Sequence, residues 1–179
     1  MPSELDRTVA GQAEAHVVTR SGVRLVLRPV SPDDGDNLRK LLACMTPSDL
    51  RFRFPASQKE PDEAALAQLL AVDHRRTEHL LAFDVRTGEP VASLMIAADA
   101  EMETAEVAIA VASGARNRGI GWALLRHAAT LAKARGIKRL QAIESRENHD
   151  ALEVERALGF ETRAIDGDPT VVLLEADLA

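Results

Sequence analysis

The chain has 179 residues, of which 46% are hydrophobic, and a formal net charge of −6 at pH 7. Its length and apolar content suit one globular domain, and the negative charge argues against nucleic acid or an anionic membrane as the main partner. The chain lacks the run of about 18 apolar residues that a membrane-spanning helix needs, and residues 1–15 lack the apolar segment of a signal peptide, so we expect a cytoplasmic protein.

The N-terminal residues are predicted to form a tail. Residues 1–17 are small, polar and aperiodic, so we expect a flexible segment there, followed by a single domain over residues 18–179. Apolar residues at alternate positions predict a first strand that begins at Val23 and stops at Pro29.

Helices are predicted to follow this strand. Ser31, followed by a proline and two aspartates, is typical of a helix start, and further helices are expected near Pro47 and across residues 62–72. Cys44 lies in the apolar run LLACM and is therefore predicted to be a core residue rather than a reactive thiol. In residues 51–54 (RFRF), we expect core phenylalanines to alternate with surface arginines rather than to form a binding strip.

The pattern changes to strands in the second half of the chain. Alternating apolar residues and intervening turn signals predict three neighbouring antiparallel strands, a long helix, a buried strand, a closing helix and a last strand pair. These elements fall at residues 79–85, 91–98, 104–111, 119–135, 138–144, 149–158, 160–165 and 170–175. The long helix joins two strands as a βαβ unit. The predicted fold class is therefore a mixed α/β sheet with helices on both faces.

A glycine-containing loop before the long helix predicts an anion site. Gly119 and Gly121 remove side chains where a ligand must approach the backbone, and the first N–H groups of the helix are unpaired at its positive end. Arg116 and Arg118 add charge that suits the oxygens of a pyrophosphate. A P-loop is disfavoured because Ile120 and Gly121 replace its Lys and Ser/Thr, and the third glycine of a Rossmann motif is missing. An ordinary strand-to-helix turn remains the alternative.

Other catalytic patterns are missing from the sequence. The histidines form no HExxH motif, and the sequence has no paired cysteines, so no metal is expected. No G-x-S-x-G elbow supplies a serine nucleophile, which favours direct transfer over a covalent acyl-enzyme.

Glu106 is the candidate catalytic residue on the strand before the loop. Alternation places Glu106, Ala108 and Ala110 on one face of that strand, so Glu106 lies beside small side chains that leave room for a ligand. A carboxylate there could act as a general base, or it could be a solvated glutamate on an edge strand.

The loop resembles that of a known family. Arg116-x-x-Gly119-x-Gly121, after a strand that ends in Val111, is similar to the R/Q-x-x-G-x-G/A acyl-CoA loop of the GNAT acetyltransferase superfamily. The AEVAIAV segment before the loop, and Asn148 and Leu158-Gly159-Phe160 after it, follow the GNAT order. The resemblance implies the GNAT fold, a mostly antiparallel sheet with a splayed parallel pair, and acetyl-CoA as co-substrate.

One branch of this superfamily looks closer, the bacterial protein lysine acetyltransferases of the Pat type. The segment from Gly22 to Pro29 resembles the opening strand of that branch, Thr46 to Phe54 resembles its [ST]-P-x-x-L-x-x-R-F helix, and Val72-Asp73 resembles the element before its first hairpin. The resemblance implies that the acceptor is a protein lysine.

The resemblance also assigns roles within the site. It implies that Glu106 is the general base and that the residues contacting acetyl-CoA are Ile109, Ala110, Val111, Arg116, Asn117, Arg118, Gly119, Ile120, Gly121, Trp122 and Asn148. As a simple helix cap Asn148 would be equally satisfied. Many GNAT enzymes protonate the leaving thiolate with a tyrosine. This chain has no tyrosine, and Glu155 stands at the matching position.

Three functions follow from these residues. The first is acetylation of a protein lysine. The second keeps the chemistry but uses a small amine such as a polyamine, an amino acid or an antibiotic, and predicts an enclosed pocket rather than an open cleft beside Glu106. The third is a non-catalytic acyl-CoA sensor, which a buried or salt-bridged Glu106 would support.

Overall fold

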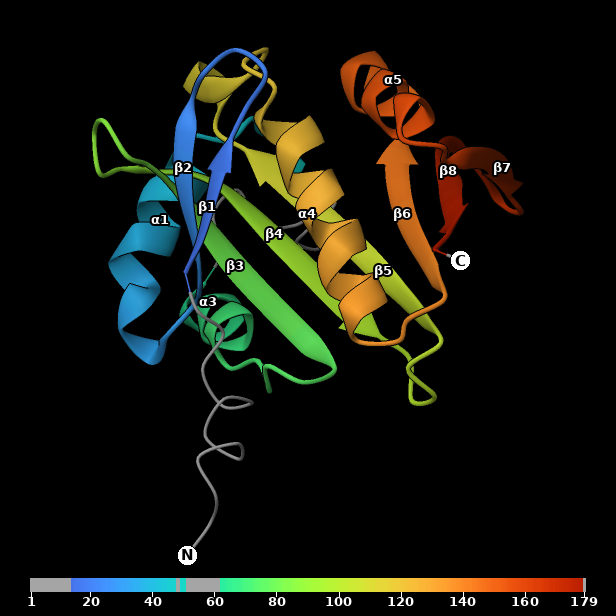
Figure 1. Ribbon diagram of the computed structural model, residues 1–179, viewed down its shortest axis with the longest axis horizontal. Helices are drawn as coiled ribbons and strands as arrows, with labels where there is room; N and C mark the ends of the chain where they lie inside the picture. The colour runs from blue at the N-terminus through green and yellow to red at the C-terminus, as the bar shows by residue number, and fades with distance from the viewer. Residues whose placement is uncertain (1–13, 48, 51–61, 179) are drawn as a thin grey trace, which may run out of the picture.

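The computed structural model describes residues 14–47, 49–50 and 62–178 (Figure 1). Within them, eight strands form one sheet in the order β1-β2-β3-β4-β5-β6-β8-β7. The strands are β1 (Ala15–Val18), β2 (Arg24–Pro29), β3 (Thr77–Asp84), β4 (Pro90–Ala98), β5 (Thr104–Val111), β6 (Arg139–Ser145), β7 (Glu161–Ile165) and β8 (Asp168–Asp177). The helices are α1 (Gly35–Ala43), α3 (Glu63–Leu70), α4 (Ile120–Ala134) and α5 (His149–Ala157), with 3-10 turns η2 (Pro32–Asp34) and η3 (Ser113–Ala115).

Neighbouring strands in this sheet run antiparallel, except for β5 and β6, which run parallel to each other. A parallel pair cannot be closed by a hairpin, and the chain crosses over through α4 between β5 and β6. The predicted βαβ unit and the predicted mixed α/β sheet are therefore confirmed.

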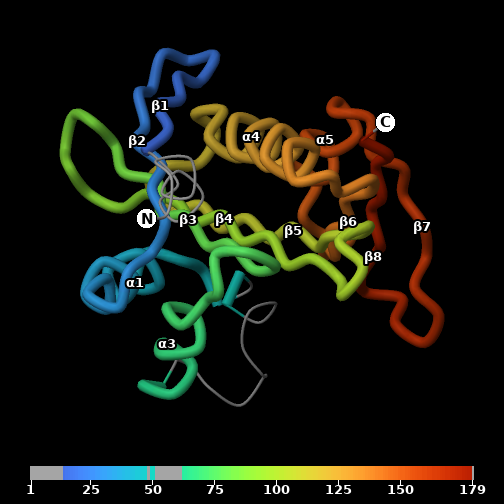
Figure 2. The backbone as a smooth tube through the Cα atoms, turned by 60° about the horizontal axis from the view of Figure 1, so that its bottom comes forward, coloured from blue at the N-terminus to red at the C-terminus, as the bar shows by residue number. Residues whose placement is uncertain are grey.

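Helices cover both faces of the sheet, as predicted. Figures 1 and 2 show α4 and α5 on one side and α1 and α3 on the other. On α4, the fully buried Leu124, Ala128 and Ala132 recur every fourth residue and form one apolar stripe against the sheet. Leu81 and Leu94 fill the core from the central strands. No helix in the described part of the chain is long and apolar enough to cross a membrane.

The prediction that ordered structure begins at Val23 is wrong. Strand β1 starts at Ala15 and pairs with β2, with Ala15 opposite Leu27 and Val17 opposite Leu25. The alternation of partly buried and exposed residues in β1 extends over only four residues, which is too short to stand out beside a polar segment. The expected boundary between a tail (1–17) and a domain therefore falls inside a strand.

The prediction that Cys44 is a core residue is also wrong, because its side chain is exposed. Cys44 caps the C-terminus of α1, and the apolar stripe of that helix continues instead through the buried Leu41 and Met45. Most of the helix expected near Pro47 and all of residues 51–54 lie outside the described residues.

The parallel strands β5 and β6 pair over only part of their length. The register joins Thr104 to Arg139 and ends with Glu106 opposite Gln141. Beyond that point β6 continues to pair with β8 as far as Ser145. The two strands therefore diverge after Glu106, which is the splay that the family resemblance implies.

Candidate active site

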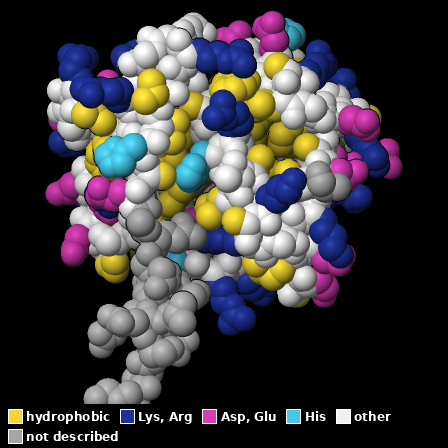
Figure 3. Space-filling model, in the orientation of Figure 1, with side chains coloured by type: hydrophobic (Ala, Val, Ile, Leu, Met, Phe, Trp, Pro, Cys, Tyr) yellow, Lys and Arg dark blue, Asp and Glu magenta, His cyan; other side chains and the backbone are white. Residues whose placement is uncertain are grey.

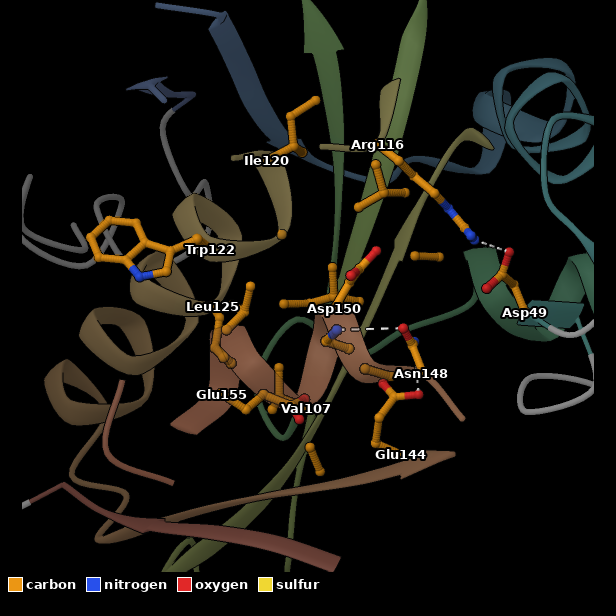
Figure 4. A pocket seen from close by; sticks show the side chains of 18 of the residues that line it. Asp49, Val107, Arg116, Ile120, Trp122, Leu125, Glu144, Asn148, Asp150 and Glu155 are labelled. Atoms are coloured by element: carbon orange, nitrogen blue, oxygen red, sulfur yellow. Dashed lines mark hydrogen bonds and ion pairs between the residues drawn. The ribbon is translucent and has the colours of Figure 1, made fainter. Parts of the chain in front are cut away.

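A cavity of about 350 Å³ opens where β5 and β6 diverge (Figure 4). Its walls come from β5, the loop before α4, the first turns of α4, β6 and α5. Apolar side chains such as Leu125, Ile143 and Val154 form part of the lining. Figure 3 shows apolar side chains at the surface between α4 and the part of the molecule formed by β6 and α5. A volume of this size is typical of a small-molecule site.

The backbone of β5 offers hydrogen-bonding groups to the cavity. The N–H of Ala112, directly after β5, donates to the carbonyl of Val91 in β4 at 2.9 Å. Because backbone groups of a strand alternate between its two edges, the N–H and C=O of Val111 and Ile109 point to the other edge, toward the divergence from β6. Ala110 lies opposite Ser93 of β4, so its backbone groups belong to the β4 edge although the residue lines the cavity.

The loop before α4 presents the N-terminus of a 15-residue helix to the cavity. Gly119 has φ +75, a left-handed conformation that favours glycine. A Cβ on Gly121 would meet no atom within 4 Å, so the backbone there is open to a ligand. Gly119, Ile120, Gly121 and Trp122 all line the cavity, and the first N–H groups of a helix have no partner within it. The geometry is that of an anion site.

The two arginines of the loop point in different directions. Arg116 lines the cavity and forms an ion pair with Asp49, which lies on the cavity wall (Figure 4). Arg118 does not line the cavity. Its guanidinium lies 3.8 Å from the carboxylate of Asp84, and its carbonyl accepts a hydrogen bond from Ser21 Oγ at 2.6 Å. Asn117, by contrast, lines the cavity, with φ 57.

Trp122 lies between two arginines at the start of α4. The guanidinium carbon of Arg20 is 4.0 Å from the ring centroid, and that of Arg126 is 4.9 Å away. Arg20 comes from the β1–β2 hairpin, so this hairpin packs beside the anion site. Cation–π contacts hold the indole in place at the edge of the cavity.

Glu106 lies at the point where the splay begins. It is exposed, it lines the cavity, and it belongs to the last residue pair between β5 and β6. Among the described residues, none forms a hydrogen bond or an ion pair with its carboxylate. The side chain is therefore accessible to a ligand in the cavity.

Asn148 uses its side chain within the protein. Its Oδ1 accepts a hydrogen bond from the N–H of Ala151 at 3.4 Å, which caps α5, and its Nδ2 donates to Glu144 Oε1 at 3.0 Å. The residue lines the cavity as predicted. Both polar atoms nonetheless have partners, so the capping role is the one that these contacts show.

Two carboxyl groups in the cavity wall, that of the buried Glu155 and that of the half-buried Glu144, have raised pKa values. Burial raises the pKa of Glu155 on α5 to about 8, and the charge of Glu144 acts in the same direction. Burial also raises the pKa of Glu144 on β6, against the lowering effect of hydrogen bonds from Asn148 and from the N–H of Ser145. Glu144 could not be identified as a site residue from the sequence, because nothing in a strand sequence shows which residues face a divergence between strands.

The cavity therefore has two chemically different ends. The helix N-terminus and Arg116 form a positive end that suits phosphate. Acidic side chains of Glu106, Glu144 and Glu155 come from β5, β6 and α5. In the part of the chain that the structure describes, no group of three or more His, Cys, Asp or Glu side chains could hold a metal ion.

The fold and the cavity define the protein as an N-acyltransferase of mixed α/β architecture. Residues 39–160 match the model of the acetyltransferase (GNAT) family, and the chain belongs to that family. Members of this family transfer an acetyl group and use acetyl-CoA as co-substrate.

Several known proteins resemble the chain. It is 27% identical, over 85% of its length and 83% of the relative's, to the acetyltransferase PA5475 of Pseudomonas aeruginosa. The GNAT domain of S. lividans PAT superposes with a TM-score of 0.81 at 28% identity, covering 92% of this chain and 96% of that one. An acetyltransferase from Thermus thermophilus superposes with a TM-score of 0.68 at 26% identity, covering 91% of this chain and 99% of that one.

Proposed function

We propose that the protein, as a single domain that includes β1, transfers the acetyl group of acetyl-CoA to the side-chain amine of a protein lysine, with Glu106 as general base. The observation that carries this proposal is the position of Glu106. Its exposed carboxylate, which has no partner among the described residues, lines the same cavity as the helix N-terminus that suits a pyrophosphate.

The described residues fit a CoA thioester. The N–H groups around Gly119 and Gly121, with Arg116, would hold the pyrophosphate once that arginine leaves Asp49. The β5 edge at Ile109 and Val111 would hydrogen-bond the pantetheine arm like an added strand. We propose Ala110, Asn117, Ile120, Trp122 and Asn148 as further contacts, since all five line the cavity. Arg118 would contribute only long-range charge.

The chemistry requires a base. A lysine ammonium group has a pKa near 10.4, so at neutral pH it must lose a proton before its nitrogen can attack a thioester. Glu106 would take that proton, directly or through a water molecule. A backbone N–H near Val111 would stabilise the negative oxygen that forms on the thioester carbonyl during the attack.

A protein lysine is favoured over a small amine by the exposure of Glu106 and by the resemblance to the Pat-type branch. A long side chain on a protein surface can reach an exposed carboxylate without entering an enclosed pocket. The rival small cationic amine is favoured by the acidic side chains of Glu106 and Glu144 in the cavity lining, whose negative charge would attract a cation.

A non-catalytic acyl-CoA sensor is the less favoured function. Such a protein needs no accessible base, and a buried or ion-paired Glu106 would have supported this role. The carboxylate is instead exposed in the cavity, and the described residues supply no ion-pair partner for it.

The decisive experiment compares wild type with Glu106→Gln. Calorimetry should give acetyl-CoA dissociation constants that agree within about twofold, because the substitution changes no phosphate contact. Thiol release should be measured with lysine peptides, intact proteins and small amines. On the best acceptor we expect kcat to fall by about 100-fold or more. Glu101→Gln, in the exposed turn before β5, is the matched control and should behave as wild type.

The possible results separate the three functions. Release driven by proteins or peptides supports the lysine acceptor, whereas release driven only by small amines replaces it with the rival acceptor. Binding of acetyl-CoA without turnover on any acceptor supports the sensor. No binding at all overturns the assignment of the loop at residues 116–121.

A further inference from the structure

Glu155 is a buried acid that faces the cavity. Its side chain comes from α5, only 7% of the residue is exposed, and it is one of the residues that line the cavity. Its Oε2 atom is fully buried and has no hydrogen-bond partner among the described residues. In the view of Figure 4, Glu155 lies between Leu125 of α4 and Val107 of β5.

Packing alone does not explain a glutamate at this position. Leu152 and Glu155 are the buried residues of α5, so an apolar side chain of similar size would complete the buried stripe. A buried oxygen without a partner is unfavourable for folding. Among the described residues, Oε2 therefore gains no hydrogen bond that would offset its burial, although the residue itself lines the cavity.

Burial and the nearby charge of Glu144 favour the neutral form of the Glu155 carboxyl group. Burial, with a smaller contribution from the charge of Glu144 on β6, raises its pKa to about 8. Glu106 on β5 brings another carboxylate to the same cavity. The cation in the cavity lining, Arg116, already forms an ion pair with Asp49. At neutral pH Glu155 thus holds a proton that it can donate.

We infer that Glu155 is a catalytic residue, and that its neutral carboxyl group donates the proton that converts the leaving CoA thiolate to a thiol. The inference rests on the proposed function. It assigns the base and the acid to two different elements that line one cavity, Glu106 on β5 and Glu155 on α5. The thioester would lie between them.

The proton transfers balance. Glu106 takes one proton from the acceptor ammonium group, and the amine nitrogen then forms a bond to the thioester carbonyl carbon. When the carbon–sulfur bond breaks, its electron pair goes to sulfur, which takes the proton of Glu155. The nitrogen then loses its second proton, which passes through water to Glu155 and restores its neutral carboxyl group. Glu106 releases its proton to solvent, so each turnover frees one proton.

The test measures kcat/KM for acetyl-CoA against pH, because this ratio reports the ionisations of the free enzyme. In the wild type, activity should fall above about pH 8 as Glu155 loses its proton. In Glu155→Gln, that alkaline decline should disappear and kcat should drop by about 10- to 100-fold. The drop is moderate because a thiol of pKa around 8 to 9 leaves with little help.

Two further variants distinguish acid catalysis from a structural role. Glu144→Gln removes the charge that helps to raise the pKa of Glu155, so the alkaline decline should move to lower pH. Glu153→Gln, exposed on the same helix, should leave both rate and profile unchanged. Calorimetry should give a dissociation constant for acetyl-CoA in Glu155→Gln within threefold of wild type.

The outcomes are separable. An active wild type whose Glu155→Gln variant keeps its rate within twofold, or keeps the alkaline decline, overturns the inference and leaves the proposed function intact. A wild type that turns over no amine overturns the proposed function itself. If Glu155→Gln fails to fold or to bind acetyl-CoA, the pH profile of Glu144→Gln tests the inference instead. An alkaline decline at the same pH as in wild type would then overturn the inference.

Discussion

Replacing Glu155 with glutamine should stabilise the protein in a way that depends on pH. Burial raises the pKa of Glu155 from the ordinary 4.5 to about 8. The native protein therefore holds this proton more tightly than the unfolded chain does. The contribution of this bound proton to the free energy of unfolding is fully present below about pH 4.5 and is lost as the pH rises toward 8. Glutamine has a similar shape and cannot ionise, so the variant lacks this loss.

The size of the effect follows from the shift. In the interval where only the native state keeps the proton, each pH unit lowers the free energy of unfolding by about 1.36 kcal/mol. Between pH 5 and pH 7.5, the free energy of unfolding of Glu155→Gln minus that of wild type should therefore increase by about 3 kcal/mol. Glu155 is almost fully buried, so screening by solvent should reduce this figure little.

Urea unfolding at pH 5, 6.5 and 7.5, followed by circular dichroism, measures this difference. Glu153→Gln is the control because Glu153 is exposed on the same helix, and its pH dependence should match that of wild type. If the difference between Glu155→Gln and wild type stayed constant within about 0.5 kcal/mol over this range, Glu155 would not hold a proton in the native state. Burial would then not raise the pKa of this carboxyl group.

Two other substitutions test the charges around the site. Asp49→Asn should tighten CoA binding by about two- to fivefold in calorimetry at low salt, because a partly exposed ion pair no longer competes for Arg116. Weaker binding would mean instead that Asp49 orients Arg116 for the ligand. Asp34→Asn should lower the free energy of unfolding at pH 7 by about 3 kcal/mol in urea denaturation, since it leaves Arg28 without its buried partner. Hydrogen bonds from Arg28 hold the pKa of Asp34 well below its usual range. The difference in the free energy of unfolding between Asp34→Asn and wild type should therefore shrink as the pH falls below 3.8. A difference that does not change with pH would contradict the pairing.

The order and type of the main elements could be predicted from the sequence. Strands β3, β4 and β5 each carry apolar side chains in a period of two or as a continuous run, and α4 carries them in a period near 3.6. These patterns are local consequences of which face is buried. The N-terminal strand β1 was not predicted, because four residues are too few to establish a period.

The anion loop could also be predicted, because its chemistry is local. Gly119 supplies a left-handed turn and Gly121 an open backbone, and a helix N-terminus follows directly. The direction of the side chains around it could not be predicted. Arg116 and Arg118 are two residues apart, yet one faces the cavity and the other pairs with Asp84 at the end of β3.

By itself, then, the sequence determined the succession of strands and helices, the loop that suits phosphate and the position of Glu106 on the strand before it. Only the tertiary structure decided that β5 and β6 part after Glu106, and that α5 places Glu155 against the resulting cavity. Burial by residues distant in the chain is what raises the pKa of Glu155. Desolvation depends on which segments pack together, and no local pattern of residues contains that information.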